Sequence, residues 1–463
     1  MAGWDTSRVL VQEEFAESKQ EGRPAKLLDA LRPAFEQAGD DAEKLDAIYS
    51  ALTRISIPDS FPFKEPSDLK GIQALRPPNR PQVRINLDEK QLFDRMYGAW
   101  LGRCVGCALG KPVECFMGPH AGMSSKDRIK TYLAAVGTGE YPLKDYFPEH
   151  SPAEDRTGRV GCKASTREHI AFMESDDDIR YTVIGQIILR EKSADFTSWD
   201  VAFAWMQYLP YRAVCTAETQ AYRNLVNRYD FHGGISAAEP DWQWVSTHYN
   251  PYREWIGAQI RADSWGYAAP GNPQLAAEFA WRDARISHVK NGIYGEMFVA
   301  AMIAAAFTCD DVREIITAGL AQIPSTSRLF KAVQEVVEIC EKYRLDPEQF
   351  EAVFDEIYAL LGHYHPVHTI NNVALVVAGL LLGGRNFGRA ITIAVMGGWD
   401  ADCNGATVGS IMGAMLGATL LPAHWTARLH DRLHSGILDY HPIAISECAK
   451  RSVAMASKIG LLS

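Results

Sequence analysis

The chain has 463 residues, of which 47% are hydrophobic and 22% are charged, and its formal net charge is −10. This composition is typical of a folded globular protein, and the length could hold a large core and two or three domains of ordinary size. The acidic balance argues against a nucleic-acid-binding surface, so we expect no nucleic-acid partner.

Two features of the sequence bear on the compartment. The first twenty residues are charged and polar, unlike a secretory signal, and the nine cysteines show no disulfide framework. Of the apolar runs, residues 373–384 are too few to span a bilayer. Residues 405–421 follow two aspartates and contain the small residues of a buried soluble helix. We expect a cytoplasmic protein with no membrane partner, and the oligomeric state stays open.

The N-terminal part has its own character. Residues 7–52 show the apolar spacing of amphipathic helices. Residues 55–83 carry prolines at positions 58, 62, 66, 77, 78 and 81. Because this density excludes a regular helix, it predicts a connector or an arm lying over the core. We therefore predict an N-terminal helical extension with a Pro-rich connector over residues 1–85 and one compact core over residues 86–463.

Helical patterns dominate the predicted core. Apolar residues recur with helical spacing over residues 178–191, 198–208, 274–283, 294–307, 312–322, 327–343, 347–361, 369–383 and 386–396. No segment shows a convincing alternation of apolar and polar residues, the pattern of a half-buried strand. The predicted fold class is all-α.

Two segments carry glycine at every fourth position. The first set is Gly98, Gly102, Gly106 and Gly110, and the second is Gly405, Gly409, Gly413 and Gly417. This spacing places each set on one helix face. Each interior glycine costs ~1 kcal/mol relative to alanine, so the stripes predict two helices in close backbone contact. That packing would bring Asp400 and Asp402 near Glu114. Cys104 and Cys107 lie on the predicted helix that carries the first stripe, and we interpret them as core or packing residues.

An acidic run, Glu174 to Asp178, precedes a segment with helical spacing and therefore lies at a helix N-terminus. One acid there caps the helix and complements its dipole, worth ~0.3–1 kcal/mol. Three adjacent aspartates repel one another and need strong solvation or a cation. Both interpretations stay open for this run alone. Clustered carboxylates favour Mg²⁺, Mn²⁺ or Ca²⁺ over zinc.

Three segments together resemble the ADP-ribosylglycohydrolase family. They are GAWLGRCVGCALGKPVE (98–114), ESDDDIRYT (174–182) and GGWDADCNGATVGSIMGA (397–414). The resemblance covers roughly residues 87–421. It implies an all-α globule whose cleft holds two divalent cations, usually Mg²⁺, and hydrolyses an ADP-ribosyl group at the anomeric carbon of its ribose.

The resemblance also implies roles for individual residues. It implies a metal-ligand set of Asp176, Asp177, Asp178, Asp400, Asp402 and Cys403. A slip of one residue in the first segment would use Ser175 instead. Glu114 is the candidate general acid or base, and Asp177 and Asp402 are further catalytic candidates.

The chain departs from the family pattern at three positions. Cys107 stands where the family has an aspartate, Trp399 where it has a glycine, and Cys403 where it has a threonine. A thiol is a poor partner for magnesium. We therefore expect two unequal cation positions, with Mn²⁺ or Ca²⁺ as alternatives to Mg²⁺.

The stretch 250–297 is polar, aromatic and rich in turns. We predict substrate contacts for Arg261, Trp265, His288 and Gly292, together with Trp399. An internal polar network is an equally weighted alternative. The histidines at 363, 365 and 368 are interpreted as loop structure, because no complete zinc-ligand set accompanies them.

These observations predict a metal-dependent hydrolase that cleaves an N- or O-glycosidic bond to ribose. The tryptophans of the middle region and Trp399 favour a small riboside over an ADP-ribosylated protein. Two alternatives stay open: a non-catalytic ligand-binding protein with the same fold, and a hydrolase of a different small glycoside or nucleoside.

Overall fold

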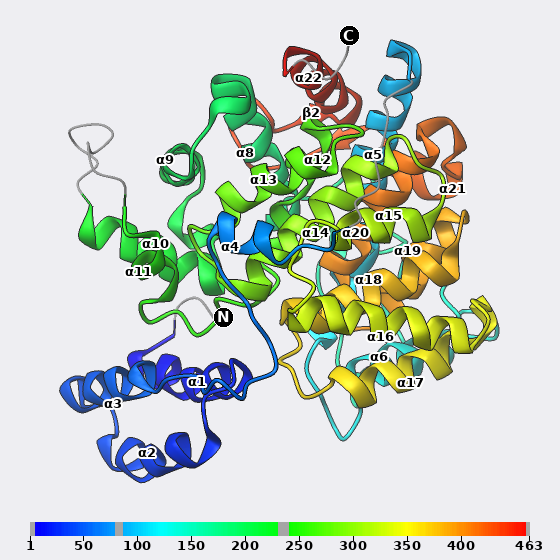
Figure 1. Ribbon diagram of the computed structural model, residues 1–463. Helices are drawn as coiled ribbons and strands as arrows, with labels where there is room; N and C mark the ends of the chain where they lie inside the picture. Colours follow the sequence, from blue (N-terminus) through cyan, green and yellow to red (C-terminus); the bar gives the residue numbers. More distant parts are fainter. Residues whose placement is uncertain (1–4, 79–86, 230–239, 460–463) are drawn as a thin grey trace.

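The computed structural model describes residues 5–78, 87–229 and 240–459. These residues are mostly helical (Figure 1). The two strands that the described chain forms, β1 (Arg432–Leu433) and β2 (Ile443–Ala444), make one short antiparallel pair. The predicted all-α fold class is confirmed.

Three helices form the N-terminal part: α1 (Ser7–Gln20), α2 (Ala25–Ala38) and α3 (Ala42–Arg54). They bury a small apolar cluster of their own, which includes Val11, Phe15, Leu28, Phe35, Leu45 and Leu52. In Figure 1 these helices, drawn in blue, lie at one side of the remaining chain. The predicted helices within residues 7–52 are therefore present.

A buried ion-pair network attaches α1 to the core. The guanidinium of Arg253 donates to Glu14 at 2.7 Å and to Glu21 at 2.9 Å. Lys290 lies 3.1 Å from Glu21. Because breaking a buried pair leaves an uncompensated charge that costs about 3–5 kcal/mol, these contacts hold α1 in one place on the core.

The proline-rich segment lies over the core, as predicted for its described part. Glu65 pairs with Arg328 at 2.7 Å, and the carbonyl of Ser67 accepts a hydrogen bond from the Trp281 indole at 2.9 Å. Residues 69–74 form a short helix, α4 (Leu69–Ala74). Residues 79–83, and the predicted domain boundary at residue 85, lie outside the described residues.

The core contains the helices predicted from apolar spacing, with ends that differ by a few residues. Its helices are α5 (Glu89–Gly110), α6 (Ser125–Val136), α7 (Glu154–Thr157), α8 (Asp177–Lys192), α9 (Ser198–Tyr208), α10 (Thr216–Arg228), α11 (Trp242–Thr247), α12 (Asp263–Ala268), α13 (Pro273–Ala284), α14 (Lys290–Ala306), α15 (Val312–Leu320), α16 (Arg328–Lys342), α17 (Phe350–Leu361), α18 (Thr369–Gly383), α19 (Phe387–Met396), α20 (Ala401–Leu416), α21 (Ala423–Thr426) and α22 (Ile445–Lys458).

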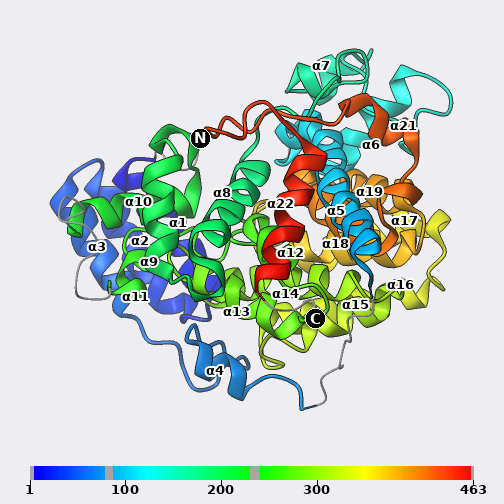
Figure 2. The same ribbon diagram turned by 90° about the horizontal axis from the view of Figure 1, so that it is seen from above.

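Three of these helices are buried along nearly their whole length: α14, α18 and α20. A helix that is apolar on every side belongs in the centre of a large globule. Other helices surround them, and Figure 2 shows α5 and α22 side by side. There the Trp100 indole donates to the Ser452 hydroxyl at 2.9 Å.

The two glycine stripes pack against each other, as predicted. A Cβ atom added at Gly102 would lie 2.1 Å from the carbonyl oxygen of Gly409, and one at Gly106 would lie 1.9 Å from that of Gly405. One at Gly110 would lie 2.2 Å from the carbonyl of Ala401. The order of these contacts shows that α5 and α20 are antiparallel, so the end of α5 meets the start of α20.

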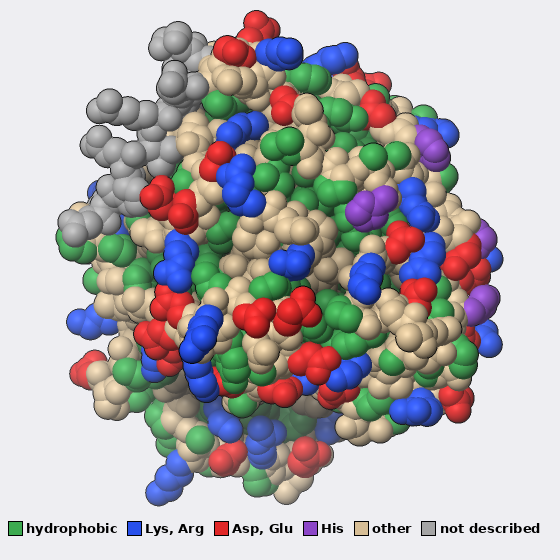
Figure 3. Space-filling view, turned by 90° about the vertical axis from the view of Figure 1, so that its right-hand side faces the viewer, with side chains coloured by type: hydrophobic (Ala, Val, Ile, Leu, Met, Phe, Trp, Pro, Cys, Tyr) green, Lys and Arg blue, Asp and Glu red, His purple; other side chains and the backbone are tan. Residues whose placement is uncertain are grey.

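The surface carries both signs of charge. On the face drawn in Figure 3, Lys and Arg side chains are interspersed with Asp and Glu. Among the described helices, none is both long and apolar enough to cross a membrane. All nine cysteines are free thiols.

Candidate metal and catalytic site

Three chain segments meet where α5 ends. They are the 3₁₀ helix η2 (Lys111–Phe116), which follows α5, and the N-termini of α8 and α20. Two sets of ligand atoms lie there, each with its members within 4.8 Å of one another. We call them the Cys107 group (Cys107, Asp176, Asp178 and Asp402) and the Cys403 group (Asp400, Asp402 and Cys403). Asp402 belongs to both.

The loop before α20 positions Asp400, and its backbone is strained at Trp399. Trp399 has φ +53°, in the left-handed region that bulky residues rarely adopt. Its N–H donates to the Ser125 hydroxyl at 2.9 Å, and its ring stacks on Tyr358 with centroids 4.3 Å apart. The Asp400 N–H donates to the side-chain oxygen of Asn372 at 3.1 Å. Tertiary contacts therefore fix the direction of this loop.

At the N-terminus of α8, Asp176 is the capping residue. Its Oδ1 accepts the Asp178 N–H at 3.0 Å, and its Oδ2 accepts from the Lys111 ammonium. The Asp178 carboxylate is also engaged, by Arg103 and by the Cys403 thiol, each at 3.2 Å. The capping interpretation therefore applies to Asp176, and both aspartates already have partners within the chain.

Other carboxylate oxygens at this site are open to a ligand. Asp402 Oδ1 is buried and accepts no hydrogen bond from the described chain. Asp177 and Glu114 are only partly buried, so they form the accessible edge of the site. Crowded hard oxygen atoms with an unsatisfied buried member fit Mg²⁺, Mn²⁺ or Ca²⁺. The residues present therefore fit the cation that the resemblance implies.

Like charges and burial dominate the electrostatics. The charge of Asp402, and then burial, raise the pKa of Glu114 well above its usual range. Burial and Asp176 raise the pKa of Asp402 to about 7. Burial also raises the pKa of Asp176, but Lys111 more than offsets this and brings it below its usual value. Mutual repulsion of this kind is relieved when a cation binds.

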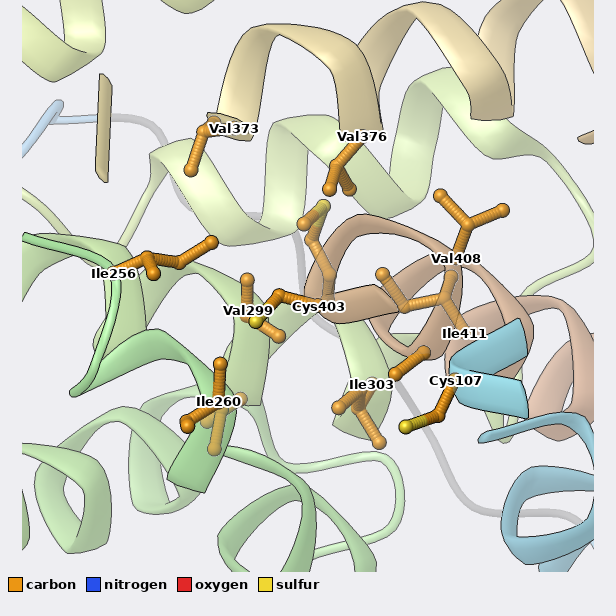
Figure 4. Packing of buried hydrophobic residues seen from close by; sticks show 14 of the residues in the cluster. Cys107, Ile256, Ile260, Val299, Ile303, Val373, Val376, Cys403, Val408 and Ile411 are labelled. Carbon is orange, nitrogen blue, oxygen red and sulfur yellow. The ribbon is translucent and has the colours of Figure 1, made fainter. Parts of the chain in front are cut away.

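The two cysteines of the site come from the two glycine-striped helices. Figure 4 shows Cys107 on α5 and Cys403 on α20 among aliphatic side chains that include Val299 and Ile303. Both thiols are buried, and burial raises the pKa of each well above its usual range. The two sulfur atoms therefore border the carboxylates on their apolar side.

A first prediction concerns the four aspartates at positions 177, 178, 400 and 402. Changing any of them to Asn should weaken cation binding while circular dichroism still shows a helical protein. The loss of cation affinity should be largest at Asp402 and Asp400. There it should exceed the roughly 10–100-fold loss that follows when a residue supporting a metal ligand is changed. Asp127→Asn, at a half-exposed site paired with Lys126, is the control. Wild-type affinity in all four variants, measured by calorimetry, would refute this site.

Three predicted substrate contacts lie in a buried network. Arg261 pairs with Asp283 at 2.9 Å, and the Trp265 indole donates to the same carboxylate at 3.2 Å. His288 Nδ1 lies 2.8 Å from the Ser287 hydroxyl. The internal-network alternative describes these residues, none of which is more than 1% exposed. Because substrate contact would need them to become exposed, we do not propose them as substrate-binding residues.

The other two predicted substrate contacts have different surroundings. A Cβ atom added at Gly292 would lie 2.6 Å from the carbonyl oxygen of Arg253, so this glycine permits close packing. Trp399 precedes Asp400 and is 4% exposed. The His363–His368 segment is loop structure in which His365 stacks on Trp255, with centroids 4.0 Å apart.

Sequence reasoning missed two cations, Lys111 and Arg103. Arg103 is fully buried and bridges Asp178 and Asp263, at 3.2 and 2.7 Å. A signal was present, because Lys111 lies between the first glycine stripe and Glu114 and follows Cys107 by four residues. That spacing puts its side chain on the helix face that carries Cys107.

Comparison with known proteins identifies the family of this chain. The family model for ADP-ribosylglycohydrolase matches residues 88–454. No curated protein matches the chain. A solved structure described as an ADP-ribosylglycohydrolase-related protein complex matches with a TM-score of 0.46 and 19% identity, over 80% of this chain and 99% of that one. The match to the family model spans most of the chain and includes all three motif segments, so the chain belongs to the ADP-ribosylglycohydrolase family.

Proposed function

We propose that this protein is a divalent-cation-dependent hydrolase of the glycosidic bond between ribose and its leaving group, in an ADP-ribosyl group or a related small riboside. Family membership supports a glycohydrolase. The observation that carries the proposal is the unsatisfied, buried Asp402 Oδ1 among carboxylates from the N-termini of α8 and α20. Most buried polar atoms in proteins have a hydrogen-bond partner, so this oxygen is available to a ligand.

The roles of the acids follow from their surroundings. Asp400, Asp402 and Asp177 would hold the cation, with Mg²⁺ as the first candidate and Mn²⁺ or Ca²⁺ as alternatives. Bound there, the ion would supply Lewis-acid polarisation, orientation of a ribose diol and a lower pKa for a coordinated water. The family resemblance implies two ions, and the Asp402 carboxylate belongs to both ligand groups.

Glu114 is the candidate general acid or base. It lies at the accessible edge of the site on η2, one turn beyond the end of α5. Cleavage of a bond to ribose passes through an oxocarbenium-like state, in which a leaving group takes up a proton and a water loses one. A carboxyl group beside the cation ligands can hold or transfer that proton.

A small substrate is favoured by the depth of the site. Asp400 and Asp402 are 5% and 2% exposed, so only a compact group can reach them. The tryptophans of the middle region contribute less to this argument than the sequence suggested, because Trp242, Trp255 and Trp265 pack in the interior. We therefore keep the small riboside as the proposed substrate class on the burial of the acids.

The test is a substrate panel with and without Mg²⁺. The panel contains small ADP-ribosides, simple N- and O-ribosides, nucleosides and an ADP-ribosylated protein, with released ribose or ADP-ribose as the readout. We expect cation-dependent turnover of one small riboside. Turnover of the modified protein alone would overturn the substrate class. Cation binding without turnover of any panel member would favour the non-catalytic alternative.

A further inference from the structure

A lysine ammonium lies inside the carboxylate cluster. Lys111 is 8% exposed, and its ammonium donates to Asp176 Oδ2. Its charge also acts on Asp402 and Glu114. A buried lysine is rare unless it is paired, so this position is a specific feature of the site.

The backbone places Lys111 in the Cys107 group. Lys111 follows α5 with helical φ and ψ of −52° and −40°, and its N–H donates to the carbonyl of Cys107. The side chains of Cys107 and Lys111 are therefore one helical turn apart on one face. The C-terminus of a helix also favours a positive charge.

Two of the three carboxylates of the Cys107 group, Asp176 and Asp178, already have cationic partners within the chain. Asp176 uses one oxygen for the α8 cap and one for Lys111. Asp178 uses one oxygen for Arg103 and one for the Cys403 thiol. Only Asp402 in this group keeps a free buried oxygen. Lys111 and Arg103, the latter shared with Asp263, therefore occupy the oxygen atoms of Asp176 and Asp178 that a divalent ion would need.

The Cys403 group differs in this respect. Among the described lysines and arginines, none forms an ion pair with Asp400 or Asp402. The unsatisfied Asp402 Oδ1 belongs to this group as well.

We propose that the Lys111 ammonium is a built-in cation that fills the Cys107 group in place of one of the two divalent ions implied by the family resemblance. The chain then binds one divalent ion, at the Cys403 group. An ammonium needs only carboxylate acceptors, and Asp176 supplies one. This inference rests on the proposed function in that both concern the same cation site.

The test is the number of ions bound per chain, before and after the ammonium is removed. Lys111→Met keeps most of the apolar stem and removes the charge. Titration with MgCl₂ and MnCl₂ by calorimetry, with elemental analysis after dialysis, should give one ion for the wild type and two for the variant. Two Mn²⁺ ions about 3.5–4 Å apart should also show magnetic coupling in the electron paramagnetic resonance spectrum of the variant alone.

Three further variants sharpen the test. Lys163→Met removes a charge from an exposed lysine, 64% exposed and 2.8 Å from Glu149, and should leave the number of ions unchanged. Lys111→Arg keeps a cation in the group and should also bind one ion. Lys111→Gln, which keeps a donor for Asp176 without the charge, should bind two and replaces Lys111→Met if that variant does not fold.

The inference and the proposed function fail separately. Two ions in the wild type, or no gain of an ion in the uncharged variants, would overturn the role of Lys111 whatever the enzyme hydrolyses. A gain of one ion on loss of the ammonium would support that role, even if no riboside in the panel is cleaved. In that case only the proposed activity would be wrong.

Discussion

Glu114→Gln should lower kcat for the riboside substrate by roughly 10²–10⁴-fold, the usual worth of a general acid or base. The substitution keeps the shape of the side chain and its place at the edge of the site, but it removes the exchangeable proton. The melting temperature should barely change, because Glu114 is only partly buried and forms none of the ion pairs that hold the core. The number of bound cations should also stay the same.

Glu174→Gln is the matched control for this variant. Glu174 precedes the aspartate run and accepts a hydrogen bond from the Ser165 hydroxyl at 2.6 Å, so it belongs to the same region. It is not a member of either ligand group, and its amide should leave kcat unchanged. Normal specific activity in Glu114→Gln, together with a large loss of stability, would assign Glu114 a structural role.

The packing of α5 against α20 was predictable from sequence because each helix carries its own glycine stripe. Four glycines at a spacing of four are unfavourable in an isolated helix, so only a close partner explains them. No comparable signal marks the attachment of the N-terminal helices. Arg253 and Glu14 are ordinary charged residues in the sequence, and their pairing at 2.7 Å becomes visible only in the fold.

The chemistry of the site was predictable in type but not in detail. The acidic run indicated either a helix cap or a cation site, and the structure assigns the cap to Asp176, with Asp177 and Asp178 in the first turn of α8. Lys111 was missed because an isolated lysine is usually exposed. Likewise, Arg261 and Trp265 are polar or amphipathic residues whose burial depends on tertiary packing. Residue type alone therefore did not separate a substrate contact from a structural network.

The close contact between α5 and α20 predicts an unusually costly glycine-to-alanine change. In a typical helix interior, Gly106→Ala would stabilise the chain by ~1 kcal/mol. Here the added Cβ would lie 1.9 Å from the carbonyl oxygen of Gly405 and 2.4 Å from its carbon. These are backbone atoms of a buried helix, so no side chain can rotate to make room.

Gly106→Ala should therefore force the two helices apart and lower the free energy of unfolding by about 3 kcal/mol or more, at the upper end of overpacking effects. Because α5 leads directly to Lys111 and Glu114, and α20 begins beside Asp400, separation should also weaken cation binding in the protein that stays folded. Gly118→Ala is the control, since nothing lies within 4 Å of its added Cβ. Chemical denaturation followed by circular dichroism measures the difference. Equal stability of the two variants would mean that the glycine stripes leave room for a methyl group. The packing of α5 against α20 would then be less close than the structure shows.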